Sequence, residues 1–253
     1  MMDREKLNIL RNGVVSIVRE IINPLSLSDS LEIERKSDKS IVTRVDKEVS
    51  SFIENETKFL TDAGYHFFSE ENPASFGFPS IILDPIDGTR ELAHGLGECV
   101  VSLAVMQGPE SGFAWIYNPF TGLELSSLNV YVPAVTHNSE NLFGYVSRSD
   151  TAKGMYKDLS LCEGVSIAAR GSIAFKLSLL AGGACDFVYS RTPKNIWDIA
   201  AGTLLCWQRG FKLYQNEREL KSLDQIRIDG ELMWCREEVF VKLSDSLMNN
   251  SLK

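Results

Sequence analysis

The stretch LDPIDGTREL (residues 83–92) carries the features from which the fold and the chemistry of this chain are inferred. It continues the apolar run PSII and then places Asp84 and Asp87 three residues apart, with Pro85 between them. A glycine and a threonine follow, so a tight bend and a hydroxyl come directly after two carboxylates at the end of an expected strand. A plain turn needs only part of this set, and the surplus of negative charge favours a bound cation.

Composition and charge limit the classes of partner. The 253-residue chain has 26 Lys and Arg against 34 Asp and Glu, a formal net charge of −8, which argues against general binding to a nucleic acid polymer. At this length a globular chain forms one large domain or two small ones. Apolar runs such as CVVSLAVM (99–106) are shorter than the about 20 residues that span a bilayer, so we expect no membrane association.

The N-terminus and the cysteines favour a cytoplasmic protein, and the histidines argue against a zinc site. The first ten residues, MMDREKLNIL, lack the apolar segment of a secretory signal. The cysteines are dispersed without a C-x-x-C pair, as in reduced cytoplasmic proteins: Cys99, Cys162, Cys185, Cys206 and Cys235. Only three histidines occur, so a zinc site is not expected.

Hydrophobic patterning predicts an α+β N-terminal half. One helix is expected over about 4–22, where apolar residues recur every three or four positions. A second is expected to begin at the N-cap Thr43, with Asp46 completing a capping box, and to end near Gly64. Strand candidates follow in quick succession and indicate an antiparallel meander: 65–72, 79–85, 99–106, 111–119 and 122–132.

Beyond about residue 136 strand and helix alternate, which is typical of an α/β arrangement. Strands are expected over 141–150, 164–171 and 186–191, and helices over 154–161, 172–185 and 196–210. We therefore divide the chain into an N-terminal α+β metal-binding half, 1–135, and a C-terminal α/β half, 136–253.

Three acidic groups lie at the ends of expected elements. Glu70 and Glu71 close one strand, Asp84 and Asp87 close another, and Asp198 lies at the start of a helix. Carboxylate oxygens are hard ligands that suit Mg²⁺ or Mn²⁺. Each group also has an ordinary alternative, namely a D-G turn, a solvated strand end or a charge that favours a helix N-terminus. The pattern alone leaves open whether the three groups converge in space.

Four ordered motifs resemble those of the inositol monophosphatase superfamily of Mg²⁺-dependent, lithium-sensitive phosphatases. They are LDPIDGT (83–89), WDIAAG (197–202), SEE (69–71) and KSDKSIVTRVD (36–46). The resemblance covers roughly residues 5–215 and departs from the family pattern at three places that bear on the lid and packing. After the second motif, QRGF (208–211) replaces the usual E-A-G-G. Ser69 replaces the usual glycine before the glutamate pair, and Ile41 replaces the proline of a mobile lid.

This resemblance implies a fold and a metal centre. The implied fold is a layered α-β-α-β-α sandwich, with an antiparallel meander sheet in the N-terminal half, a smaller mixed sheet with helices in the C-terminal half, and the active site at their interface. Two or three Mg²⁺ ions are implied, with Mn²⁺ as the alternative metal. The implied ligands are Glu70, Asp84, the backbone carbonyl of Ile86, Asp87 and Asp198.

Roles for catalytic and substrate-binding residues follow from the same resemblance. Asp46 is expected to pair with Thr89 to hold and polarise the attacking water, and Glu70 is expected to take part in catalysis. Substrate contacts are expected from Gly88, Thr89, Asp198, the lid residue Lys36 and Arg191.

The residues around the motifs favour one substrate class without deciding it. The segment YSRTPKNIWD (189–198) carries Arg191 and Lys194 and no acidic residue before Asp198, which resembles the 3′(2′),5′-bisphosphate nucleotidase branch. An arginine can bind a second phosphate through two parallel hydrogen bonds. We therefore expect a bisphosphate nucleotide, with an inositol monophosphate, a sugar phosphate or histidinol phosphate as alternatives. A non-catalytic metal- or nucleotide-binding protein of this fold is a hypothesis of a different class, and the sequence does not decide between a monomer and a homodimer.

Overall fold

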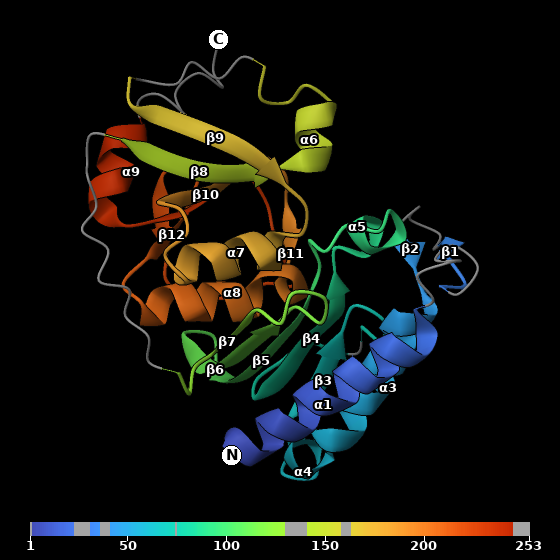
Figure 1. The fold of residues 1–253 in the computed structure, drawn as a ribbon. Helices are drawn as coiled ribbons and strands as arrows, with labels where there is room; N and C mark the ends of the chain where they lie inside the picture. Colours follow the sequence, from blue (N-terminus) through green and yellow to red (C-terminus); the bar gives the residue numbers. More distant parts are fainter. Residues whose placement is uncertain are drawn as a thin grey trace.

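The computed structural model describes residues 2–22, 31–35, 41–73, 75–129, 141–157 and 163–244. Helices α1 (Arg4–Ile21) and α3 (Arg44–Glu56) form an outer layer at the N-terminal end of the molecule (Figure 1). In α1 the apolar side chains at three- and four-residue spacing are buried, as predicted: Leu7, Leu10, Val14, Val18 and Ile21. Helix α3 begins after the predicted N-cap Thr43 but ends earlier than expected, and a separate turn, α4 (Lys58–Thr61), precedes Gly64.

Among the described residues, the first sheet has five strands in the order β3-β4-β5-β6-β7. Its strands are β3 (His66–Ser69), β4 (Ser80–Asp87), β5 (Val100–Gly108), β6 (Ser111–Tyr117) and β7 (Glu124–Ser126). Strands β4 to β7 form the predicted antiparallel meander. The expectation is wrong for β3, which runs parallel to β4, so the carboxyl ends of these two strands lie at the same edge.

The second sheet is mixed, as expected, but it is not the smaller one in strand number. In the part of the chain that the structure describes, it has six strands in the order β13-β12-β15-β10-β8-β9. Its strands are β8 (Leu142–Ser147), β9 (Val165–Arg170), β10 (Phe187–Ser190), β12 (Lys212–Gln215), β13 (Arg218–Leu220) and β15 (Leu232–Cys235). The last three are only three or four residues long, and so short a run carries little of the alternation from which strands are predicted.

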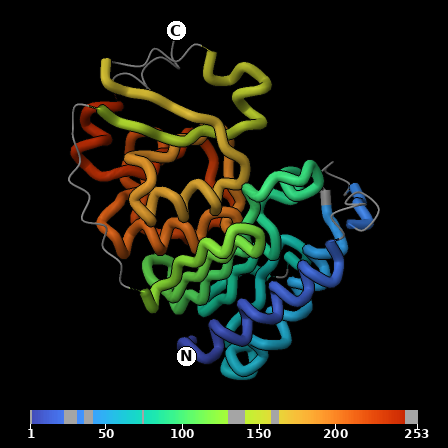
Figure 2. Tube along the Cα trace, viewed as in Figure 1, coloured from blue at the N-terminus to red at the C-terminus, as the bar shows by residue number. Residues whose placement is uncertain are grey.

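Helices α7 (Ile173–Ala181) and α8 (Ile196–Gln208) fill the space between the two sheets (Figure 1). Both helices are apolar on nearly all sides, as a layer covered on two faces requires. Figure 2 shows that these helices lie against the green strands of the first sheet, although residues 127–172 lie between the last of those strands and α7 in the chain. The far face of the second sheet carries α6 (Arg148–Ala152) and α9 (Glu237–Leu243), which completes the predicted sandwich of alternating layers.

Short elements complete the fold near the site. They are α5 (Thr89–Ala93), the pair β1 (Glu34–Arg35) and β2 (Ile41–Val42), and the pair β11 (Lys194–Asn195) and β14 (Arg227–Ile228). The helix predicted over 154–161 is found earlier, as α6, and residues 158–161 lie outside the described part of the chain. The division expected at residues 135 and 136 also lies outside it. Within the described residues no helix combines the length and apolar character needed to cross a membrane.

Candidate active site

A bulge in β4 turns its two aspartates toward one another. Residues three apart in a regular strand point to opposite faces of the sheet. Asp84 pairs with Ser102 and Asp87 pairs with Val100, so three steps along β4 match two along β5. This extra residue is a β-bulge, which Pro85 tolerates because a bulged position has no ladder hydrogen bond to lose. The carboxylates of Asp84 and Asp87 therefore lie on the same side.

The backbone after Asp87 requires a glycine. Gly88 has a φ of +100°, and a Cβ there would lie 2.8 Å from the carbonyl oxygen of Glu98. The turn leads directly into α5, whose first residue is Thr89. The Thr89 hydroxyl lies 2.9 Å from the carbonyl oxygen of Ile86, so the predicted backbone ligand and the predicted catalytic hydroxyl are neighbours.

The other two predicted carboxylate ligands reach this edge from different elements. Glu70 directly follows β3, and because β3 and β4 are parallel with Ser69 opposite Leu83, Glu70 emerges beside Asp84. Asp198 lies in the first turn of α8, where it accepts a hydrogen bond of 3.1 Å from the Asn195 N–H.

Three of these carboxylates form a compact group. One oxygen from each of Asp84, Asp87 and Asp198 lies within 4.8 Å of the others. Glu70 lies outside this group but lines the same cavity of about 350 Å³. The structure thus brings together the predicted residues Glu70, Asp84, Ile86, Asp87, Gly88, Thr89 and Asp198 in the wall of one cavity.

The electrostatics of the group fit a divalent cation. Burial, with the charges of Glu70, Asp87 and Asp198, raises the pKa of Asp84 well above its usual range. Burial, with the charges of Asp87 and Glu70, raises the pKa of Asp198 to about 8. Such raised pKa values mean that the fold forces negative charges together without enough protein cations to offset them. A set of buried oxygen donors with excess negative charge is the arrangement that Mg²⁺ and Mn²⁺ bind.

Asp46 lies behind Thr89, where both of its carboxylate oxygens have partners. Its Oδ2 accepts hydrogen bonds from the Thr43 hydroxyl at 2.5 Å and the Thr43 N–H at 2.8 Å. Its Oδ1 accepts from the Thr89 hydroxyl at 3.0 Å. The capping box that starts α3 therefore aims one Asp46 oxygen at Thr89, and burial raises the pKa of Asp46 to about 6.

Asp87 is held from the opposite side by the start of α7. Its Oδ2 accepts hydrogen bonds from the Ser172 hydroxyl at 2.7 Å and from the Ala174 N–H at 2.5 Å. No motif in the sequence identified these donors. The signal that could have done so is Ser172 itself, which follows a glycine and precedes an apolar helix, a typical N-cap position.

Cationic side chains line the same cavity as the carboxylates: Arg90, Arg148, Lys153, Arg170, Lys176 and Lys194. Glu98 takes a hydrogen bond from Arg148, and Glu98 Oε1 lies 3.5 Å from Nε of Arg170. One carboxylate thus faces two arginines.

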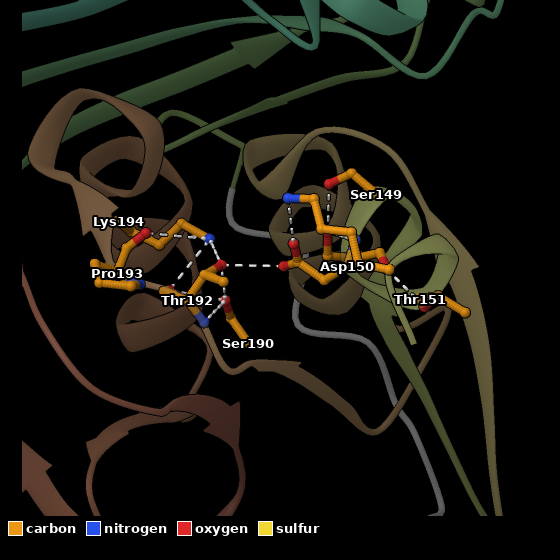
Figure 3. A network of polar contacts seen from close by, with 9 residues as sticks. Ser149, Asp150, Thr151, Ser190, Thr192, Pro193 and Lys194 are labelled. Atoms are coloured by element: carbon orange, nitrogen blue, oxygen red, sulfur yellow. Dashed lines mark hydrogen bonds and ion pairs between the residues drawn. The ribbon is translucent and has the colours of Figure 1, made fainter. Parts of the chain in front are cut away.

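The two wall lysines share a second carboxylate. Nζ of Lys153 lies 3.6 Å from Oδ1 of Asp150. Figure 3 shows Thr192 between Asp150 and Lys194, donating to the first at 3.1 Å and accepting from the second at 2.6 Å. This wall is defined by Arg148, Lys153, Arg170 and Lys194. Among the described residues, Glu98, Asp150 and the cavity-lining Glu91 offset part of its charge, and Lys194 also lies near Asp198. Outside the metal-binding carboxylates, four cations therefore stand against three carboxylates, which leaves a small net positive charge.

One predicted substrate-binding residue, Arg191, is not in the cavity wall. Arg191 turns the other way, where its guanidinium donates to the carbonyl of Met155 and lies 3.6 Å from Glu231. Its backbone belongs to the same segment as Lys194, but Lys194 faces the cavity and Arg191 does not. Lys36 lies outside the described residues.

Comparison with known proteins agrees with this geometry. A family model described as the inositol monophosphatase family matches residues 3–210. The inositol monophosphatase of Mesembryanthemum crystallinum is 26% identical over 202 residues, which are 70% of this chain and 74% of that protein. The fructose-1,6-bisphosphatase/inositol-1-monophosphatase of Thermotoga maritima is 28% identical over 189 residues, 70% and 73% of the two chains.

A solved structure shares the fold over almost its whole length. The IMPase of Thermotoga maritima matches with a TM-score of 0.76, covering 99% of this chain and 98% of that one at 21% identity. The five-layer arrangement and the clustered carboxylates are thus accompanied by a family match over most of the sequence. The chain belongs to the inositol monophosphatase family, whose members are enzymes that hydrolyse phosphomonoesters.

Proposed function

We propose that this chain is a Mg²⁺-dependent phosphomonoesterase whose substrate is a small metabolite with a second anionic group. The observation that carries the proposal is a single cavity whose wall holds both a compact carboxylate group and a set of arginines and lysines. Carboxylates alone would repel a phosphate dianion, so the acidic side requires metal ions before a substrate can bind there.

Glu70, Asp84, Asp87, Asp198 and the Ile86 carbonyl would hold the metal ions. When bound, Mg²⁺ or Mn²⁺ supplies the positive charge that offsets the phosphate oxygens and the developing charge of the transition state. The chain itself supplies the placement: the bulge orients Asp84 and Asp87, and Ser172 and Ala174 fix the Asp87 carboxylate.

Asp46 and Thr89 provide a route for a proton. The Thr89 hydroxyl donates to Oδ1 of Asp46, which leaves the lone pairs of the hydroxyl oxygen free to accept from a water molecule in the cavity. Because Thr43 occupies the other oxygen of Asp46, the acid can accept a proton only on the side that faces Thr89. The pair would therefore orient the attacking water and take up its proton.

The positive wall supports a substrate with a second phosphate. Arg148 and Arg170 share one carboxylate, so an incoming phosphate can pair with a guanidinium that is already positioned. We retain a 3′(2′),5′-bisphosphate nucleotide as the favoured substrate, but we assign the second phosphate to this wall and not to Arg191.

An inositol or sugar phosphate is the second candidate. The names of the two relatives above favour it, since one is an inositol monophosphatase and the other combines that activity with fructose-1,6-bisphosphatase. A non-catalytic binding protein is less well supported because every predicted carboxylate ligand and the Asp46–Thr89 pair are present together.

A substrate panel tests the proposal. Phosphate release would be measured with Mg²⁺ for 3′,5′-ADP, fructose 1,6-bisphosphate, inositol 1-phosphate and histidinol phosphate. We expect the two bisphosphates to give the higher kcat/KM. A preference for inositol 1-phosphate over both would reject a role for the wall in substrate choice.

Variants of the wall sharpen the test. Lys153→Met and Arg170→Met should each lower kcat/KM for the preferred bisphosphate about 10- to 150-fold, the value of a lost charge-assisted hydrogen bond, and change inositol 1-phosphate hydrolysis little. Lys157→Met is the matched control, because Lys157 is an exposed lysine in the same segment that does not line the cavity. Equal losses of kcat/KM on all substrates would show that the wall residues stabilise the fold and do not select the substrate.

A further inference from the structure

Lys176 is a buried cation in an apolar helix. It lies in the first turns of α7, among Ile173, Phe175 and Leu177, and is only 3% exposed. A buried ammonium is costly unless its protons find acceptors. Nζ of Lys176 donates to three backbone carbonyls, those of Arg170 at 3.2 Å, Gly171 at 3.1 Å and Ser172 at 2.7 Å.

These contacts separate Lys176 from the other cations of the cavity. An ammonium has three protons, and three carbonyls accept them, so none remains for a substrate phosphate. Helix stability does not explain the residue either, because the positive end of the helix dipole lies at the N-terminus and disfavours a cation there. Lys176 also lies near the Asp87 carboxylate, whose charge favours the ammonium, but its hydrogen bonds go to the three carbonyls.

The carbonyls belong to the turn formed by residues 170–172, which joins β9 to α7. Ser172 has a φ of +46°, an unfavourable conformation for a residue with a side chain. Such a conformation persists only where surrounding contacts enforce it. Glu98 holds the N–H of Gly171 at 2.7 Å on one side of the turn, and Lys176 holds the carbonyls on the other.

The 170–172 turn helps to orient the Asp87 carboxylate. The Ser172 hydroxyl and the Ala174 N–H both donate to the same Asp87 oxygen, Oδ2, so Oδ1 takes part in neither of these hydrogen bonds. A shift of the turn would move both donors together. The path from ammonium to carboxylate is therefore short: Lys176, the turn 170–172, Asp87.

We propose that Lys176 is a positioning residue that fixes the 170–172 turn and thereby orients the Asp87 carboxylate for metal binding. The inference rests on the proposed function in one respect, that Asp87 is a metal ligand. Lys176 would then help to set the metal affinity although its side chain contacts neither the metal nor the substrate.

The direction in which metal affinity changes when Lys176 loses its charge distinguishes a positioning role from a purely electrostatic one. A positive charge near the carboxylates repels a divalent cation, so its removal alone would tighten metal binding. Loss of the contacts that orient a ligand has the opposite effect and typically weakens metal affinity about 10- to 100-fold. A positioning role therefore predicts weaker binding in a neutral variant, and a purely electrostatic role predicts tighter binding.

Calorimetric titration of Mg²⁺, and separately of Mn²⁺, into metal-free protein measures the direction of this change without substrate. Lys176→Met should bind about 10- to 100-fold more weakly than the wild type. Lys176→Gln, which is neutral but keeps two amide donors, should recover part of the affinity. Arg209→Met is the matched control, because Arg209 is also a buried cation bonded to backbone carbonyls, those of Leu205 and Asn129, but does not line the cavity.

A double-mutant cycle tests the path. If Lys176 acts through Ser172, the losses in metal affinity of Lys176→Met and Ser172→Ala should be less than additive in the double variant. Unchanged or tighter binding by Lys176→Met and Lys176→Gln, additive losses, or an equal loss in Arg209→Met would each overturn the inference. A wild type that binds neither metal would reject the proposed function as well, which distinguishes the two failures. If Lys176→Met does not fold by near-ultraviolet circular dichroism, Lys176→Gln decides alone.

Discussion

Replacing Asp198 with asparagine should stabilise the metal-free protein while it removes activity. Burial and the neighbouring negative charges make the ionised form of Asp198 unfavourable, and they raise its pKa from 3.8 to about 8. Asparagine removes the charge but keeps a side-chain oxygen that can accept the hydrogen bond from the Asn195 N–H. A ligand has been lost, so Mg²⁺-dependent turnover should nearly vanish.

The size of the stabilisation depends on pH. A carboxyl group whose pKa is higher in the folded state than in the unfolded state contributes full stability below pH 3.8, and this contribution declines as the pH rises through about 8. Between pH 5 and pH 8 the shift corresponds to a loss of about 4 kcal/mol in the free energy of unfolding. Because the Asp198 side chain is only partly buried, solvent screening reduces this, and we expect about 2 kcal/mol.

Urea unfolding of metal-stripped protein at pH 5 and pH 8 measures the effect. The Asp198→Asn variant should be more stable than the wild type at pH 8, with a much smaller difference at pH 5. Asp224→Asn, at an exposed aspartate, is the control and should follow the wild type at both pH values. A variant less stable than the wild type at pH 8, or a difference that does not vary with pH, would refute the account of a charge-strained site.

Three further predictions concern the same cavity. Thr89→Val removes the hydroxyl that joins Asp46 and should lower kcat about 10²- to 10⁴-fold with the fold intact by circular dichroism; an unchanged kcat would exclude the proton route. Gly88→Ala should cost about 1–3 kcal/mol in urea unfolding because of its φ of +100°, and a fully stable variant would contradict the structure of the turn. Excess chelator should stop phosphate release, Mg²⁺ should restore it and millimolar Li⁺ should inhibit it, whereas activity that persists in chelator would exclude metal dependence.

The sequence predicted the chemical groups of the site better than their meeting in space. The helix starts at Thr43 and Asp198 and the strand before Asp84 follow from local signals, namely capping residues and apolar runs. The convergence of Glu70 with Asp84 depends on the parallel pairing of β3 with β4, a contact between strands that no local pattern encodes. Only the family resemblance supplied it before the structure did.

The sequence also did not predict the directions in which side chains point. Arg191 and Lys194 are two cations in one short segment, and nothing in their sequence separates them. The tertiary partners Met155 and Glu231 draw Arg191 away, while β11 presents Lys194 to the cavity. The sequence does contain a signal for the buried contacts of Lys176. A lone charge inside the apolar run IAFKLSLL must find buried hydrogen-bond partners if the helix is covered on all sides.

We expect the carboxylates of β4 and α8 to form a metal centre, and anomalous X-ray diffraction from crystals soaked in Mn²⁺ can locate the ion without an activity assay. A strong anomalous peak should lie within coordination distance of Asp84, Asp87 and Asp198, and it should be absent from crystals of Asp87→Asn. Clear density for these side chains with no anomalous peak between them, at Mn²⁺ concentrations that support phosphate release, would contradict this expectation.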